Sequence, residues 1–169
     1  TPARGCFGSM WTPRAAAKAT AAFAVFCLLS GVVYLVNDVQ DREADRQHPI
    51  KSRRPIASGA LSPTVARVAA MVLTVVALGS AYWFNRSFGI VALVYLTLLT
   101  LYSVSLKHIV IVDVLTISGG FVLRALGGAV AIDVKFSHWL LLLMLLLALF
   151  LALSKRRAEL VTLAGGATS

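Results

Sequence analysis

The sequence predicts an all-α integral membrane protein, and three observations lead to this fold class. Hydrophobic residues make up 59% of the 169 residues, and the mean hydropathy is +0.83. Five apolar segments of about 15 to 24 residues compare with the roughly 20 residues that an α-helix needs to cross a bilayer. Basic residues gather in alternate connections between these segments, as is typical of membrane proteins. We therefore expect one transmembrane domain over residues 1–169 and exclude a water-soluble core.

The five predicted helices follow one another in antiparallel order. They cover approximately residues 15–36, 65–84, 88–106, 109–132 and 139–153. One long connection, residues 37–61, separates the first two helices and contains proline and glycine, which are typical of loops. The other connections are short, and short connections join neighbouring antiparallel helices. The connections that begin at Asn37, Lys107 and Lys155 should therefore lie on one face of the membrane.

Positive charge is distributed unevenly along the chain. The formal net charge of +9 comes from 16 Lys and Arg residues against 7 Asp and Glu residues. In a water-soluble protein such an excess would suggest a nucleic-acid partner. Here most loop cations lie in the three connections named above, whereas the alternate turns hold only Arg86 and Lys135. Because basic connections stay in the cytosol, we expect a multi-pass membrane protein with its charged face in the cytosol and no nucleic-acid partner.

An acidic motif follows directly from the first apolar helix. It comprises Asn37, Asp38, Asp41 and Asp45. At about 100° per residue the three aspartates fall on one helical face, where like charges need a counterion. Mg²⁺ prefers oxygen ligands and typically joins one or two carboxylates to the phosphates of a substrate. The motif therefore predicts a magnesium-diphosphate site in which the three aspartates are metal ligands and catalytic residues. The alternative is a solvated helix end whose carboxylates pair with arginines of the same turn.

A basic segment comes next in the chain. Lys51, Arg53 and Arg54 lie between two prolines. Arg suits bidentate contacts with phosphate and Lys acts as a point charge, so these residues are candidates for binding an anionic substrate. The alternative is that they only set the topology and contact anionic lipid headgroups, and both interpretations stay open. His48 is expected to form hydrogen bonds within the loop, because no second His lies at metal-ligand spacing.

Two further groups of polar residues lie at the same predicted face. Tyr102 and Lys107 end the third helix and would bring a phenol and an ammonium group to a phosphate-filled cavity. Taken alone, they are explained more simply as anchors at the membrane interface. Lys155, Arg156 and Arg157 close the fifth helix, and a stop at the cytosolic boundary is the simpler explanation of that run.

Two charged residues lie inside the fourth apolar segment. Asp113 and Arg124 fall on nearly the same helical face, but roughly 16 Å of helical rise separates them, so we do not expect them to pair. Charges within a membrane helix usually face the protein interior. We expect Asp113 to lie close to the substrate and Arg124 to have a structural role.

The pattern N-D-x-x-D-x-x-x-D at residues 37–45 resembles the first aspartate-rich motif of the UbiA superfamily of intramembrane prenyltransferases. The segments R-P-I-A-S-G, Y-S-V-S-L-K, D-V-L, G-F-V-L-R-A and A-L-F-L-A-L-S-K-R-R-A-E-L are similar to its decaprenyl-phosphate phosphoribosyltransferase branch. The resemblance covers residues 23–163. It implies a nine-helix bundle of which this chain supplies the second to the sixth helix, without the first and the last three. We expect such a fragment to be inactive alone.

The resemblance also implies a reaction. Prenyltransferases of this superfamily typically carry a second aspartate motif after their sixth helix, where this sequence has the cations Lys155, Arg156 and Arg157. Cations at this place suit a donor with an additional phosphate. We therefore expect an Mg²⁺-dependent pentosyltransferase that transfers 5-phosphoribose from phosphoribosyl diphosphate to polyprenyl (decaprenyl) phosphate, for the lipid-linked arabinose donor of cell-wall biosynthesis. The implied substrate-binding residues are Asn37, Lys51, Arg53, Arg54, Tyr102, Lys107, Lys155, Arg156 and Arg157.

Two other functions are compatible with parts of the sequence. One is a UbiA-type prenyltransferase that moves a polyprenyl group from its diphosphate to an aromatic acceptor. The other is a membrane transporter, since intramembrane Asp113 and Arg124 would line a pathway. A transporter predicts charge spread through the membrane, whereas most of the charge here clusters on one side.

Overall fold

The computed structural model describes residues 13–106, 110–135 and 137–166, and within them every regular element is a helix. The elements in chain order are α2 (Pro13–Gln40), α3 (Arg42–Gln47), the 3-10 turn η1 (Lys51–Arg53), α4 (Pro63–Phe84), α5 (Arg86–Leu101), the π-helical turn η2 (Tyr102–Leu106), α6 (Val110–Ala131) and α7 (His138–Gly166). The predicted all-α fold class is confirmed.

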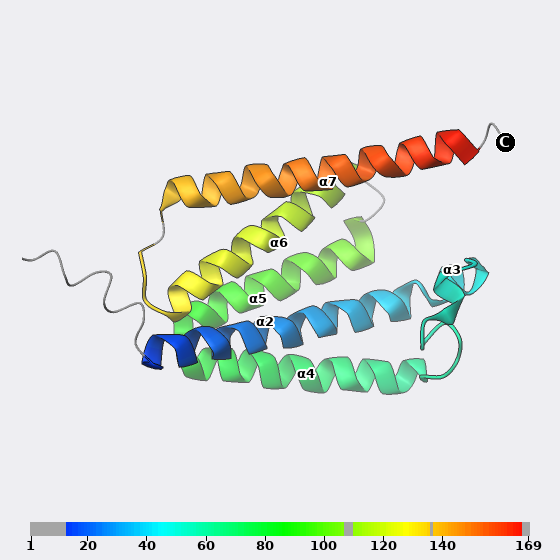
Figure 1. The fold of residues 1–169 in the computed structure, drawn as a ribbon. Coiled ribbons are helices and arrows are strands. Elements are labelled where there is room, and N and C mark those ends of the chain that lie inside the picture. Colours follow the sequence, from blue (N-terminus) through cyan, green and yellow to red (C-terminus); the bar gives the residue numbers. More distant parts are fainter. Residues whose placement is uncertain (1–12, 107–109, 136, 167–169) are drawn as a thin grey trace, which may run out of the picture.

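The long helices lie side by side in an up-and-down arrangement (Figure 1). α2 packs against α4, α5 and α6, and α7 packs along α6 at the edge of the bundle. The end of α2, the start of α4, the end of α5 and the start of α6 meet at one end of the bundle, together with α3. We call it the α3 end. α7 runs towards the same end, so the described parts of these elements agree with the predicted common face.

Four helical segments of the described chain are long and apolar enough to cross a membrane. They are Pro13–Gln40, Pro63–Phe84, Arg86–Val104 and Val112–Ala131. The remaining predicted span lies in α7, whose apolar part, His138–Ser154, is shorter. α7 continues beyond the predicted end at residue 153 because Lys, Arg, Glu and Ala are good helix formers, so the hydrophobic run ends before the helix does.

The outer surface of the bundle supports a membrane setting. Large apolar side chains are exposed along α4 and α7, among them Val75, Trp83, Leu143 and Phe150, with exposed fractions between 63% and 92%. In water this surface would be unfavourable, whereas lipid chains cover it at no such cost.

The core lies where α2, α4 and α5 meet, and α6 borders it. Leu29, Phe88 and Tyr95 are fully buried there. The Phe26 ring lies edge-on to the rings of Phe88 and Tyr95, with centroid distances of 5.7 and 5.2 Å. α6 approaches this ring at Gly127, where an added Cβ would lie 2.5 Å from Phe26. These contacts fix the relative positions of α2, α5 and α6.

Candidate functional site

Asp38, Asp45 and Arg54 form an ion-pair cluster at the α3 end. The Nη1 atom of Arg54 donates to Oδ1 of Asp38 at 2.8 Å and to Oδ2 of Asp45 at 2.9 Å. Asp38 lies in the last turn of α2, Asp45 lies in α3, and Arg54 follows η1 directly. One guanidinium group therefore joins three elements, and the structure brings together two of the predicted aspartates and one of the predicted cations.

The third aspartate, Asp41, lies at the break between α2 and α3. Its backbone N–H donates to the carbonyl oxygen of Asn37 at 2.9 Å, and the N–H of Asp45 donates to the carbonyl oxygen of Asp41 at 2.8 Å. These bonds span four residues each, as in an α-helix. The acidic motif therefore keeps a spacing close to helical across the break.

The carboxylates of this cluster fit a magnesium ion that is shared with a substrate. Oxygen atoms of Asp38 and Asp45 converge on one cationic nitrogen, so both can contact a single cation. Among the described residues, no group of three or more His, Cys, Asp and Glu side chains is placed to hold a metal ion. Mg²⁺ commonly takes one or two carboxylates and completes its octahedron with water and phosphate oxygens. The geometry suits that arrangement better than a cage made only of protein ligands.

Arg46, one of the two arginines in α3, does not pair with the aspartates in the contacts that the structure shows. Nε of Arg46 donates to the carbonyl oxygen of Ala57 at 3.0 Å, and its Nη1 lies 3.4 Å from Oε1 of Glu43. For Asp38 and Asp45, the alternative of pairing with arginines of their own turn is therefore wrong, because their described partner is Arg54.

The loop after α3 is organised around His48. Its Nδ1 accepts hydrogen bonds from the backbone N–H groups of Ile50 and Lys51 at 3.2 and 3.4 Å, which confirms the predicted loop role. Lys51 and Arg53 are exposed, in contrast to the half-buried Arg54. Of the predicted basic segment, only Arg54 contacts the acidic motif in the described structure.

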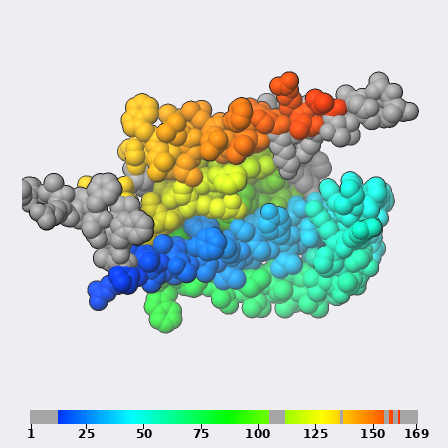
Figure 2. Space-filling view, viewed as in Figure 1, coloured from blue at the N-terminus to red at the C-terminus, as the bar shows by residue number. Residues whose placement is uncertain are grey.

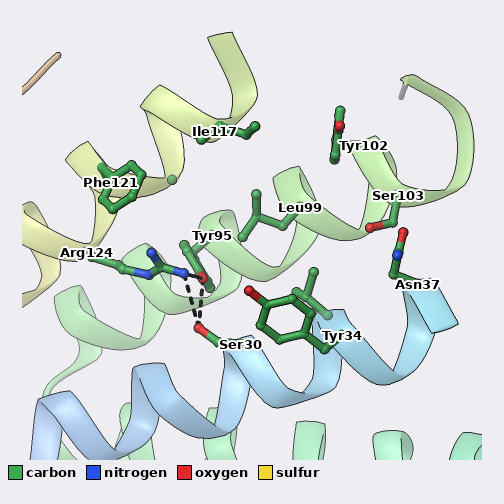
Figure 3. Close-up of a pocket in the computed structure, with 12 residues that line it drawn as sticks. Ser30, Tyr34, Asn37, Tyr95, Leu99, Tyr102, Ser103, Ile117, Phe121 and Arg124 are labelled. Atoms are coloured by element: carbon green, nitrogen blue, oxygen red, sulfur yellow. Dashed lines mark hydrogen bonds between the residues drawn. The ribbon is translucent and has the colours of Figure 1, made fainter. Parts of the chain in front are cut away.

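A cavity of about 460 Å³ opens between α2, α5 and α6 (Figure 3). Its polar lining residues are Ser30, Tyr34 and Asn37 from α2, Tyr95, Tyr102 and Ser103 from α5 and η2, and Arg124 from α6. Asn37 lies at one end of this set and Arg124 at the other. Because Asp38 follows Asn37, the cavity leads from the acidic motif into the interior of the bundle.

Arg124 forms a second polar cluster at the inner end of the cavity. Its Nη2 donates to the hydroxyl oxygen of Tyr95 at 2.6 Å and to Oγ of Ser30 at 3.2 Å. Its Cζ also lies 5.2 Å from the ring centroid of Tyr95 and 5.5 Å from that of Phe121. These contacts join α2, α5 and α6, as the predicted structural role requires, but Arg124 also lines the cavity.

A second, mostly apolar cavity of about 660 Å³ continues along α2 and α6. It shares Ser30, Tyr34 and Arg124 with the first cavity, and Phe23 and Gly128 are among its other lining residues. The two cavities together join a polar region near the acidic motif to an apolar region between two membrane-spanning helices.

Tyr102 reaches the first cavity from η2, and its hydroxyl donates to Oδ1 of Asp113 in α6. π-helical turns such as η2 occur frequently at functional sites. Asp113 therefore contacts a residue that lines the cavity, and its place near the substrate stays a prediction. Lys107 lies outside the described residues.

The predicted cations Lys155, Arg156 and Arg157 belong to α7, the helix at the edge of the bundle. α7 packs along α6, which lies between α7 and α2 in Figure 1, and α7 forms a separate ridge in the space-filling view (Figure 2). Arg157 is exposed, and the side chains of Lys155 and Arg156 lie outside the described ones. These cations share the α3 end of the bundle, but Arg157 shows no described contact with the acidic motif.

Sequence reasoning missed most of the polar cavity, although a signal was present. Ser30, Tyr34 and Asn37 follow the spacing i, i+4, i+7 along α2, and Tyr95 and Tyr102 are likewise seven residues apart. Such spacing places side chains on one helical face. Polar side chains on one face of an apolar helix indicate a polar interior surface.

The chain is similar to known proteins over most of its length. Residues 6–156 match the UbiA prenyltransferase family. The chain is 43% identical over 145 residues to a decaprenyl-phosphate phosphoribosyltransferase of Mycolicibacterium smegmatis. It is 42% identical over 143 residues to that of Mycobacterium tuberculosis and 39% identical over 142 residues to that of Corynebacterium glutamicum. The alignments cover 86%, 85% and 83% of this chain but 46%, 47% and 43% of the relatives, so the chain spans about half of their length.

Proposed function

This chain belongs to the UbiA prenyltransferase family, and from that membership we propose that its protein transfers 5-phosphoribose from phosphoribosyl diphosphate to polyprenyl phosphate and releases diphosphate. The observation that carries the proposal is the identity of 39% to 43% with three relatives that are named decaprenyl-phosphate phosphoribosyltransferase. The matched residues 6–156 include the acidic motif, the basic segment and both cavities.

The acidic motif would hold the donor. Asp38 and Asp45 would bind Mg²⁺, and Asp41 would supply a further carboxylate. Asn37, which lines the cavity, would orient or ligate the metal-bound donor. Bound Mg²⁺ neutralises charge on the leaving diphosphate as the bond between C1 of the ribose and oxygen breaks. Lys51, Arg53 and Arg54 supply further positive charge for donor phosphates beside the motif.

The cavities would hold the acceptor. The apolar cavity along α2 and α6 suits a prenyl chain, and the polar cavity leads from it to Asn37 and Tyr102 at the α3 end. A phosphate oxygen of the acceptor would attack C1 of the ribose. Because this nucleophile is already an anion, the reaction needs no general base.

The proposed setting is the bacterial inner membrane with the α3 end in the cytosol. The excess of Lys and Arg in the connections at this end supports that orientation. The donor is water-soluble and the acceptor is a lipid, so a site at the end of a membrane bundle gives each substrate its own route.

The test is a transfer assay with the protein expressed from its full open reading frame. With radiolabelled phosphoribosyl diphosphate, decaprenyl phosphate and Mg²⁺, we expect label in the lipid fraction, and EDTA should abolish it. Prenylation of 4-hydroxybenzoate from a polyprenyl diphosphate, without labelled lipid from the first assay, would contradict the proposal and favour the aromatic prenyltransferase alternative.

A further inference from the structure

Arg54 makes a contact that a substrate-binding cation would not need. Its Nη1 lies 2.8 Å from Asp38 and 2.9 Å from Asp45, two carboxylates of the motif that would hold Mg²⁺. We propose that Arg54 is a built-in counterion of this motif: it occupies the two carboxylates before the metal and diphosphate bind, and then transfers to the diphosphate. The inference rests on the proposed function.

Burial explains why a counterion is needed. The side chain of Asp45 is only 5% exposed, whereas that of Arg54 is 38% exposed. An unpaired carboxylate in such a position is strongly unfavourable. Asp45 therefore always needs a cationic partner, which is Arg54 before the metal binds and the metal afterwards. The side chain of Arg54 is more exposed than that of Asp45, so it has room to leave.

Geometry makes the two cations competitors. Oδ1 of Asp38 and Oδ2 of Asp45 both accept hydrogen bonds from Nη1 of Arg54, and these oxygen atoms are the ones that would face a shared Mg²⁺. A divalent ion added beside a guanidinium at this distance would be repelled. Binding of Mg²⁺ therefore requires that Arg54 moves away from the carboxylates.

The released guanidinium has an anionic partner close by. A diphosphate bound to the metal brings oxygen atoms to the same place, and guanidinium groups suit bidentate contacts with phosphate. Arg54 would thus oppose binding of the metal alone and favour binding of the metal with diphosphate. It is a positioning residue whose effect is a coupling between two ligands.

The experiment measures Mn²⁺ binding to the detergent-solubilised full-length protein by EPR of free Mn²⁺, with and without inorganic diphosphate. Mn²⁺ replaces Mg²⁺ because both prefer oxygen ligands. Without diphosphate, Arg54→Gln should bind Mn²⁺ about tenfold more tightly than the wild type, because no cation must be displaced. Diphosphate should tighten Mn²⁺ binding in the wild type and much less in Arg54→Gln.

Arg67→Gln is the matched control, since it removes the same charge from an exposed residue near the start of α4, outside the proposed binding site. It should leave both affinities unchanged. An equal effect of both substitutions would overturn the proposal in favour of a general charge effect. Unchanged or weaker Mn²⁺ binding by Arg54→Gln would also overturn it, because Arg54 would then only hold the segment together. If Arg54→Gln does not fold, Arg54→Lys carries the test: its ammonium lacks the planar fork of Arg, so diphosphate should tighten Mn²⁺ binding less than in the wild type.

Transfer of labelled phosphoribose separates this inference from the proposed function. If the wild type transfers phosphoribose but Arg54→Gln does not bind Mn²⁺ more tightly, the counterion role alone is overturned. If Arg54→Gln binds Mn²⁺ more tightly but the wild type does not transfer phosphoribose, the counterion role is supported and the reaction is contradicted. Failure of the wild type to bind Mn²⁺ with or without diphosphate would overturn both the counterion role and the proposed metal site.

Discussion

The molecule holds charge in two contrasting ways at the two ends of one cavity. At the α3 end, Asp38 and Asp45 share the cation Arg54. In the interior, Arg124 contacts the hydroxyl groups of Ser30 and Tyr95 and two aromatic rings. The first arrangement can exchange one cation for another, because its partners carry full charges. The second fixes three helices through neutral partners, so it suits a permanent structural contact.

The largest effect should follow from removal of a charge at the α3 end. Asp38→Asn keeps the size of the side chain but removes a proposed Mg²⁺ ligand, so the proposed transfer rate should fall by about 10² to 10³-fold. The rate is measured with labelled phosphoribosyl diphosphate. Asp133→Asn is the control, because Asp133 is exposed and has a φ of 58°, a conformation that Asn also tolerates. A normal rate in Asp38→Asn would contradict the proposed functional role of the ion-pair cluster at the α3 end.

The next effect concerns the packing that holds the interior cluster. In Gly127→Ala the new Cβ would lie 2.5 Å from the buried Phe26 ring, so this ring or α6 must shift. We expect a loss of about 1–3 kcal/mol in the free energy of unfolding, measured by thermal or denaturant unfolding in detergent. Gly128→Ala is the matched control, since a Cβ there meets nothing within 4 Å. Equal stability of the two variants would show that α2 and α6 do not approach as closely as described.

Arg124→Met tests whether the interior cation is structural. The substitution keeps an unbranched side chain but removes the hydrogen bonds to Tyr95 and Ser30, whose hydroxyl groups remain 3.1 Å apart and can still pair. We expect a loss of about 1 kcal/mol in stability, because the hydroxyl groups keep each other as partners.

Arg67→Met removes an exposed cation from α4 and serves as the control. Mn²⁺ binding should be the same in the wild type and in both variants. A change in Mn²⁺ affinity with Arg124→Met would show that the two ends of the cavity are coupled and would break the distinction between them.

The same contrast explains what the sequence could predict. The acidic motif is contiguous, so its helical spacing and its chemistry follow from local sequence, and the five apolar segments predict the helical order. The pairing with Arg54 depends on the path of the loop through η1, and the contacts of Arg124 with Ser30 and Tyr95 depend on how three helices meet. Such contacts arise from tertiary packing, which helical periodicity does not encode.

The smallest effect should come from an exposed ion pair beside the buried one. Glu43 lies 3.4 Å from Arg46 and 3.9 Å from Arg42, but its side chain is 74% exposed. Water screens such pairs, so Glu43→Gln should change stability by only about 0–0.5 kcal/mol. Asp45→Asn, two residues away in sequence, should cost more because the side chain of Asp45 is 5% exposed and pairs with Arg54. Unfolding of both variants in low and high salt measures the difference. An equal loss of stability in the two variants would mean that the buried pair of Asp45 with Arg54 contributes no more than the exposed pairs of Glu43.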